Sequence, residues 1–530
     1  MKTRNILIAL LGTTMMLASC DSYLDKLPDD RAEVDTEEKV AKLLTNCYPQ
    51  SSNVLMMEVS SDNVLDNGTQ YSNFPGVEEI YRFKEVTSTF NDDPRSFWNN
   101  AYRAVASANE ALSSIDAMSE DMTPTLAGMR SEALLCRAFG MFMLSNVFCM
   151  AYDPQKANEY LGLPYPLEPE QDPNAKYERG TLEELYANIA NDIEAAMPTL
   201  NDSYMSIPKY HFNTKAAYAF AARFYLYYHK YDKVIEYATK ALGSSPANYL
   251  RDYSKYKDLA GSQDIFNAYI QSGENANFML LPAYSMAARV FEGSYLRFVH
   301  NEEVLGFETY WARCPWAASN ATSGNNLLWM AHTLYGNNLI TMFPKMFESF
   351  EYTDKVNGTG YSHVVDTYFT GDETLLCRAE AYALRNKEGD LQKAMDDMNT
   401  WCSTNLEESY GSMTRRTYTI EQIDAFMQNT HYSPVVPEDK ALRSIKKTLH
   451  PQGFTVNAGQ QESLIQLVLH MRRLTTQSQG TRFMDLKRYG IEYAHFVDKE
   501  EPIVFTAGDL RGALQLPNDV ITAGLEANPR

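Results

Sequence analysis

Residues 213–227 read NTKAAYAFAARFYLY, and this stretch predicts the architecture of the whole chain. Its apolar residues recur at helical spacing, and the small side chain of Ala222 lets a second helix approach closely. A turn at 230–232 is followed by the apolar side of a return helix, which ends at Pro246. Such a pair is typical of a tetratricopeptide unit, whose apolar face only a neighbouring helix pair can bury.

Two other segments repeat part of this pattern. Residues 134–139 and 375–380 also place a small residue before an arginine within a helical pattern; the three arginines are Arg137, Arg223 and Arg378. The arginines are 86 and 155 positions apart, so the units are not tandem copies. We therefore predict helix pairs that are embedded among long insertions.

Further helices are predicted on both sides of these pairs. Residues 94–117 carry apolar side chains at helical spacing, and Thr181 and Glu184 form a capping-box pattern before a helix that ends at Pro198. Between about 259 and 370 the periodicity fades, and no stretch alternates strictly enough to indicate a large sheet. The expected fold is all-α, with a helical scaffold over about 35–258 and 371–530 and a loop-rich insertion over about 259–370, in a single domain of residues 35–530.

The N-terminus has the features of an export and anchoring signal. Lys2 and Arg4 precede an apolar run at 6–17, and small residues lead to Cys20. This run is too short to span a bilayer as a stable helix. The sequence resembles a bacterial lipobox, which implies a signal peptide at 1–19, acylation of Cys20 and an acidic tether at 20–34.

Composition excludes several classes of function. The 530 residues include 47 Lys and Arg against 68 Asp and Glu, for a net charge of -21. A nucleic-acid partner is not expected, because such binding depends on basic side chains that neutralise phosphates. An acidic surface is also repelled by anionic lipid. We therefore expect membrane contact only through the lipid on Cys20.

Neither a metal site nor a catalytic site is indicated. Six cysteines remain beside Cys20, so disulfides stay open in an exported protein, but no CxxC spacing suggests zinc. The HExxH, GxSxG and P-loop patterns are absent, and no cofactor is expected. The polar residues Arg482, Asp485, Lys487 and Arg488 alternate with apolar anchors, which favours a packed helix end with internal ion pairs.

Aromatic and amide residues in loops are the candidates for ligand binding. Sugar recognition uses flat rings for the apolar face of a pyranose and amides or carboxylates for its hydroxyl groups. The insertion supplies one such set: Tyr310, Trp311, Trp316, Trp329, Asn320, Asn325 and Asn326. The loop at 65–74 supplies a second set with Asn67, Tyr71 and Phe74. The alternative is that each tryptophan only packs its loop onto the scaffold.

Several strings, in this order along the chain, resemble the SusD/RagB family of Bacteroidetes surface lipoproteins. They lie at 20–25, 98–110, 130–142, 163–192, 213–227, 480–490 and 515–529, and the segment 480–490 (GTRFMDLKRYG) matches a family signature. Thr475 and Gln479 stand where the family usually has acids.

The resemblance implies a surface-exposed, outer-membrane lipoprotein without enzymatic activity. It would capture oligosaccharides and deliver them to a SusC-type TonB-dependent transporter. A peptide-binding protein of the RagB type is one alternative. A tetratricopeptide-type scaffold lipoprotein that binds only protein is the other.

Overall fold

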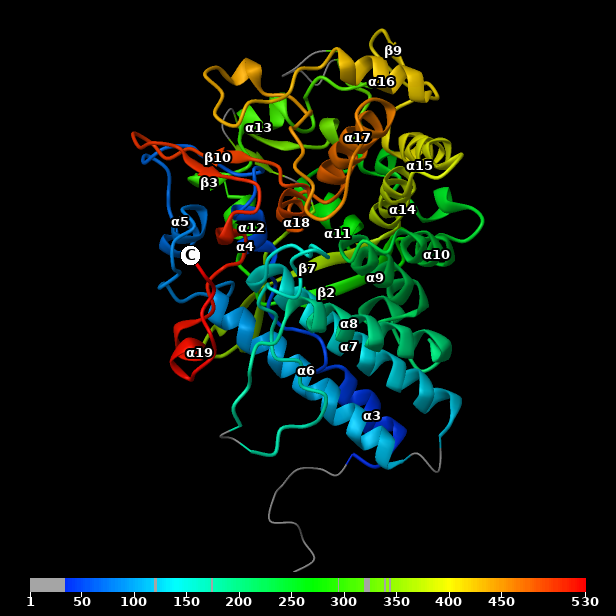
Figure 1. Ribbon diagram of the computed structural model, residues 1–530, viewed down its shortest axis with the longest axis vertical. Helices are drawn as coiled ribbons and strands as arrows, with labels where there is room; N and C mark the ends of the chain where they lie inside the picture. The colour runs from blue at the N-terminus through cyan, green and yellow to red at the C-terminus, as the bar shows by residue number, and fades with distance from the viewer. Residues whose placement is uncertain are drawn as a thin grey trace, which may run out of the picture.

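The computed structural model describes residues 34–118, 122–172, 175–293, 295–318, 325–337, 340–342 and 345–530. Most described elements are helices, and the predicted all-α fold is confirmed (Figure 1). The predicted signal peptide, Cys20 and all but the last residue of the tether lie outside the described residues, as does Asn320. None of the described helices is both long and apolar enough to cross a membrane.

The N-terminal half of the scaffold is built around one central helix. Its helices are α3 (Glu37–Leu44), α4 (Val54–Val59), α5 (Pro75–Tyr81), α6 (Pro94–Ala117), α7 (Pro124–Phe148) and α8 (Leu182–Ala196). Helix α7 packs against both α6 and α8, and every residue from Ser131 to Phe148 is buried. A helix that is apolar on all sides is expected at such a position, because neighbours cover its whole circumference.

The predicted starts of α6 and α8 are confirmed. Pro94 is the first residue of α6, and the carboxylate of Asp93 accepts a hydrogen bond from the backbone N–H of Ser96 at 2.6 Å. Thr181 and Glu184 form both hydrogen bonds of the capping box at α8. Local capping chemistry therefore determines where these helices begin.

The helix pair predicted from 213–246 consists of α9 (Thr214–Tyr227) and α10 (Tyr231–Leu242). A second pair, α14 (Gly371–Arg385) and α15 (Asp390–Asn405), packs beside it through α10 and α9 (Figure 1). Ala222 is fully buried. Arg223 on α9 and Glu373 on α14 are 150 residues apart in the sequence, yet the two helix pairs cover each other's apolar faces.

The three repeated arginines have the same structural role. Each is buried and forms a two-pronged ion pair with a carboxylate on a packed neighbouring helix: Arg137 with Asp192, Arg223 with Glu373, and Arg378 with Asp397. The nitrogen–oxygen distances are 2.6–2.9 Å. The planar guanidinium suits this geometry, so the repeats mark the contacts between helices.

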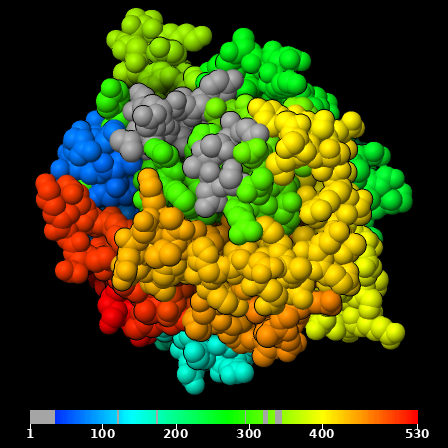
Figure 2. Space-filling view, turned by 90° about the horizontal axis from the view of Figure 1, so that it is seen from above, coloured from blue at the N-terminus to red at the C-terminus, as the bar shows by residue number. Residues whose placement is uncertain are grey.

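The insertion contains more regular structure than the sequence predicts. It includes α11 (Ser262–Tyr269), α12 (Ala287–Phe291) and α13 (Glu302–Phe307), and a sheet in the order β2 (Asn277–Ala283), β7 (Thr359–Thr370) and β6 (Ser349–Asp354). The C-terminal half of β7 is mostly buried, whereas its N-terminal half is mostly exposed or half-buried. Its sequence therefore has no uniform alternation of polar and apolar residues. The insertion, in green, and the chain after α15, in yellow and orange, form much of the face seen in Figure 2.

The C-terminal part consists of α16 (Ile420–Gln428), α17 (Gln460–Thr475), α18 (Thr481–Tyr489), α19 (Asn518–Thr522) and the strand pair β10 (Tyr493–His495) and β11 (Ile503–Phe505). Helix α18 lies within the segment 480–490, which resembles the family signature. As predicted, its polar residues form internal ion pairs: Arg482 binds Asp62 at 2.7 Å, and Arg488 binds Asp485 at 2.9 Å. Lys487 donates instead to three backbone carbonyl oxygens.

A buried ion cluster joins α13 to this C-terminal part. The carboxylate of Glu308 is fully buried and accepts hydrogen bonds or ion pairs from Arg443, Lys447 and Arg473 at 2.8–2.9 Å. Burial alone would raise the pKa of Glu308, but the three cations outweigh it and hold the pKa well below its usual range. Arg473 also reaches Asp62 at 3.4 Å, which extends the cluster to the N-terminal half.

Two of the residues that were predicted to contact a ligand, Trp316 and Tyr310, lie in the core instead. Trp316 is 1% exposed, and its ring centroid lies 5.6 Å from that of Trp401 and 5.9 Å from that of His470. Tyr310 is also 1% exposed, and its hydroxyl donates to the carbonyl oxygen of Leu474 at 2.9 Å. Both side chains pack the insertion onto α15 and α17, which is the alternative that the sequence left open.

The six cysteines other than Cys20 are all buried and form no disulfide. Cys136 and Cys377 lie within α7 and α14, where they act as small core residues.

Replacing Trp316 with Ala is expected to reduce the free energy of unfolding by about 3–5 kcal/mol, because a large cavity would open between α15 and α17. Urea denaturation of the two proteins measures this difference. Trp316→Phe keeps a ring at the site and should lose much less stability. An unchanged unfolding midpoint for Trp316→Ala would show that the ring is not part of the core.

Replacing Glu308 with Gln is expected to destabilise the protein by about 3 kcal/mol or more at pH 7, because three buried cations lose their shared counter-charge. The folded-state pKa is depressed, so this stabilisation exists above the unfolded pKa of about 4.3 and is lost as the pH falls. Denaturation curves between pH 7 and pH 3 should therefore converge for the two proteins. Glu302→Gln, at an exposed residue of the same helix, is the control and should match wild type throughout; a constant difference at all pH values would contradict this account.

Candidate ligand-binding site

The loop at 65–74, predicted to bind ligand, lies against a segment more than 220 residues away in the sequence. Strand β1 (Leu65–Asp66) pairs antiparallel with β3 (Phe298–Val299). The backbone then continues the contact: Ser72 donates to Tyr295 at 2.8 Å, and Arg297 donates back to Ser72 at 3.0 Å. Two loops are thereby joined into one surface.

A buried ion pair fixes this junction. Asp66 accepts from Arg297 through both carboxylate oxygens, each at 2.7 Å, and its side chain is 1% exposed. The hydrogen bond to Asp66 and the charge of that carboxylate raise the pKa of Arg297. Asp66 also accepts from the backbone N–H of Gly68 at 2.8 Å, which holds the turn that begins the loop. This geometry makes the junction rigid.

Two tyrosine rings lie at the surface of the junction. Tyr295 is 72% exposed, and its ring centroid lies 6.5 Å from that of the half-buried Tyr71, with the ring planes 32° apart. Neither hydroxyl has a hydrogen-bond partner among the described residues. We call Tyr71 and Tyr295 the tyrosine platform: it offers an accessible ring face, and two hydroxyl groups that a ligand can reach.

The tyrosine platform rests on a small apolar cluster. Leu296 and Val299 are buried, and Tyr71 and Phe74 pack against them. Beside the cluster, the side chain of Asn67 accepts a hydrogen bond from Asn301 at 3.2 Å. Phe74 therefore supports the platform through the apolar cluster, and Asn67 supports it through the hydrogen bond with Asn301.

Tyr295 is the residue that sequence reasoning missed. It lies in the short string Gly293-Ser294-Tyr295, and an aromatic residue in a glycine and serine turn is the signal that could have identified it. Its pairing with the loop at 65–74 has no local signature, because it depends on backbone contacts between distant segments.

The remaining predicted residues are not part of the tyrosine platform. Trp311 is half-buried, and its indole N–H donates to the carbonyl oxygen of Ala331 at 3.3 Å. Trp329 is half-buried in a short 3-10 helix (Trp329–His332), at the wall of a separate cleft. Asn325 is exposed, whereas Asn326 is buried and fixes the loop through the backbone of Tyr310 and Leu328.

The described residues contain no group of three or more His, Cys, Asp or Glu side chains placed to hold a metal ion. The carboxylates near the platform are already engaged, since Asp66 binds Arg297 and Glu78 binds Arg82 at 2.8 Å. These contacts make them parts of the scaffold.

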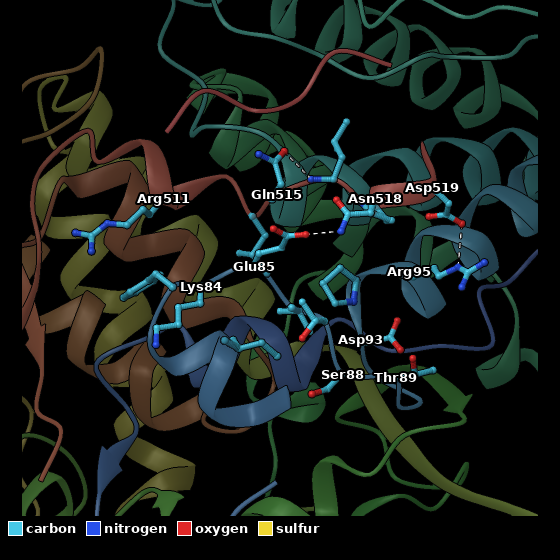
Figure 3. Close-up of a pocket in the computed structure, with 18 of the residues that line it drawn as sticks. Lys84, Glu85, Ser88, Thr89, Asp93, Arg95, Arg511, Gln515, Asn518 and Asp519 are labelled. Atoms are coloured by element: carbon cyan, nitrogen blue, oxygen red, sulfur yellow. Dashed lines mark hydrogen bonds and ion pairs between the residues drawn. The ribbon is translucent and has the colours of Figure 1, made fainter. Parts of the chain in front are cut away.

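Another cavity, of about 350 Å³, lies between the chain at 83–95 and the C-terminal segment 511–519 (Figure 3). Charged and polar side chains pair across it: Arg95 binds Asp519 at 2.9 Å, and Asn518 donates to Glu85. Figure 3 shows these pairs bridging the two segments. Their contacts hold the C-terminal segment against the start of α6, and we assign this cavity no ligand.

Comparison with known proteins gives a consistent result. Residues 22–226 match a SusD-like family model described as "Starch-binding associating with outer membrane". Among curated proteins, no sequence matches this chain.

Solved structures share the fold along nearly the whole chain. A SusD superfamily protein from Bacteroides thetaiotaomicron is 18% identical, covers 93% of this chain and 100% of its own, and has a TM-score of 0.61. A SusD superfamily protein from Bacteroides vulgatus is 16% identical over 94% and 99%, with a TM-score of 0.62. A SusD-like carbohydrate binding protein from the same organism is 15% identical over 92% and 96%, with a TM-score of 0.57. Residues 22–226 match the SusD-like family model, and the chain shares the fold of solved SusD superfamily proteins along nearly its whole length, as the family-like motifs predict.

Proposed function

We propose that this protein is a surface-exposed lipoprotein of the outer membrane that captures oligosaccharides and delivers them to a SusC-type TonB-dependent transporter. The family description, which names starch and the outer membrane, and the carbohydrate-binding relative support this proposal. The observation that carries it is the tyrosine platform, where exposed Tyr295 lies beside Tyr71 on a junction held by the Asp66–Arg297 ion pair.

The platform has the chemistry that a sugar requires. An aromatic ring offers a flat apolar surface to the C–H face of a pyranose, while the free hydroxyl groups exchange hydrogen bonds with those of the sugar. If one stacked ring removes about 100 Å² of apolar surface from water, the contribution is roughly 2.5 kcal/mol. After the cost of association, affinity in the millimolar to micromolar range is expected. Such weak binding suits a protein that must release its ligand to a transporter.

The proposal includes no catalytic step. A glycosidase requires two carboxyl groups on either side of the bond that it cleaves. Near the platform, Asp66 and Glu78 instead neutralise arginines of the scaffold. The ligand is therefore expected to leave the site unchanged.

Replacing Tyr295 with Ala is expected to weaken oligosaccharide binding about 5- to 150-fold, a loss of about 1–3 kcal/mol. The free energy of unfolding should change by less than about 1 kcal/mol, because the ring is mostly exposed. A glycan array identifies a bound oligosaccharide, and isothermal titration then compares the variants.

Tyr352→Ala is the matched control, since Tyr352 is 54% exposed but lies on β6, outside the platform. Unchanged affinity for Tyr295→Ala would remove the platform from the binding site. Binding of a peptide library without any glycan would support the RagB-type alternative, and binding of neither class would favour the scaffold alternative.

Replacing Cys20 with Ala is expected to release the protein from the outer membrane, because the acidic chain has no other attraction to lipid. Fractionation of cells that produce the variant, with a high-salt wash, measures this. Surface labelling of wild type tests exposure in the same cells. A Cys20→Ala protein that still sediments with the membrane after the wash would contradict lipid anchoring.

A further inference from the structure

A cleft of about 700 Å³ lies apart from the tyrosine platform, and Trp329 forms part of its wall. Two 3-10 helices, Pro246–Tyr249 and Tyr253–Tyr256, form one side, and the segment after α15 forms another. None of the residues that line it belongs to the platform or to the loop at 65–74. Its volume is in the range of about 300–1,000 Å³ that is usual for small-molecule sites.

Contacts between segments hold the walls in place. Leu328 and Leu406 form a backbone bridge, and the N–H of Glu407 donates to the carbonyl oxygen of Leu327 at 2.7 Å. The guanidinium of Arg415 donates to the carbonyl oxygens of Ser403 and Leu406 at 2.7 and 2.8 Å. The cleft is therefore formed before any ligand binds.

The 3-10 helix that carries Trp329 is also held in place. His332 stacks on Tyr410 with ring centroids 4.3 Å apart, and its Nε2 lies 3.3 Å from a carboxylate oxygen of Glu407. This contact anchors the 3-10 helix that begins with Trp329. The indole is held at the wall by this helix, and the ammonium group of Lys257 lies 5.8 Å from the centroid of its ring.

Several side chains that line the cleft have no partner within the described protein. Lys255, Asn248 and Asn275 are exposed, and their side chains form no hydrogen bond with other described residues. The indole N–H of Trp329 has no acceptor there either. The cleft thus combines one flat aromatic ring with amide, ammonium and indole donors that are available to a ligand.

The charges of the lining favour an uncharged ligand. Four carboxylates line the cleft, from Asp252, Glu274, Glu407 and Glu408. They exceed the two lining cations, Lys255 and Arg415. Arg415 is bound to backbone carbonyl oxygens and lies 3.7 Å from Glu408, so the other three carboxylates face a single lining ammonium group. Carboxylates accept hydrogen bonds from sugar hydroxyl groups but repel the carboxylate of a uronic acid.

We propose that this cleft is a second oligosaccharide-binding site, separate from the tyrosine platform and selective for neutral sugars. The inference rests on the proposed function, because it assigns a further site for the same class of ligand. Two sites on one chain raise the apparent affinity for a polysaccharide that can occupy both, without any new contact. Short oligosaccharides fill the two sites independently.

The experiment tests two classes of sugar, neutral and uronic-acid-containing oligosaccharides, on wild type and three variants. A glycan array of neutral and uronic-acid-containing oligosaccharides identifies bound sugars, beginning with maltohexaose and maltoheptaose because the family description names starch. Isothermal titration with a bound neutral sugar then gives the stoichiometry for wild type, Trp329→Ala, Asn248→Ala/Asn275→Ala and Tyr295→Ala. The asparagine variant guards against loss of folding, because both side chains are exposed and form no hydrogen bond with other described residues.

Wild type is expected to bind two equivalents of the neutral sugar, and the Trp329 and Asn248/Asn275 variants one. Tyr295→Ala should also bind one, through the cleft. One equivalent for wild type that both cleft variants retain would overturn the second site while leaving the proposed function intact. A preference of the cleft for uronic acids would overturn its selectivity, and a wild-type protein that binds no glycan would overturn the proposed function as well.

Discussion

The structure depends on the burial of charged side chains that neutralise one another across distant parts of the chain. Glu308 lies in the insertion and Asp62 in the N-terminal half, and their cationic partners come from residues 443–482. A buried charge without a partner is costly, so each group tolerates burial only when the others are in place. This requirement brings the insertion, the N-terminal segment and the C-terminal helices into one arrangement.

Further hydrogen bonds extend the same junction. The carboxylate of Glu58 accepts from Asn63, Gln477 and the backbone of Ser478 and Gly480 at 2.8–3.2 Å. His495 contacts the carbonyl oxygens of Tyr81 and Ser61, and burial lowers its pKa. The chain at 58–63 is thereby fixed just before the loop at 65–74. This junction fixes the position of the tyrosine platform, although the platform lies on segments with little regular secondary structure.

The two proposed sites divide the task of ligand capture differently. The tyrosine platform is an open surface with an exposed ring, whereas the cleft at Trp329 surrounds its ligand with polar groups. Both are weak sites by the chemistry available, and weak contacts at two places hold a long chain while allowing each contact to release quickly. A protein that transfers its ligand to a partner needs this combination of capture and release.

Most scaffold helices and the starts of α6 and α8 could be predicted from the sequence, because they depend on local spacing and capping. The ion pairs of the repeated arginines were found only in the structure, because their carboxylate partners lie on other helices. The motif at 480–490 likewise indicated a packed helix end, since apolar anchors alternate with its charges. The candidate site could be predicted only in part. Tyr71, Asn67 and Phe74 were identifiable as a polar and aromatic loop, but composition cannot distinguish a tryptophan that faces solvent from one that faces the core.

Only the tertiary structure decided that Trp316 is buried and that Tyr295 is exposed. Trp316 is covered by Trp401 and His470, which are 85 and 154 residues further along the chain, and Tyr295 is placed by its backbone contact with Ser72. Exposure is a property of what packs against a side chain, and here those neighbours come from distant segments. The sequence by itself therefore determined the helical scaffold and its resemblance to the SusD/RagB family, whereas the surface that can meet a ligand was decided by contacts that form only when the whole chain has folded.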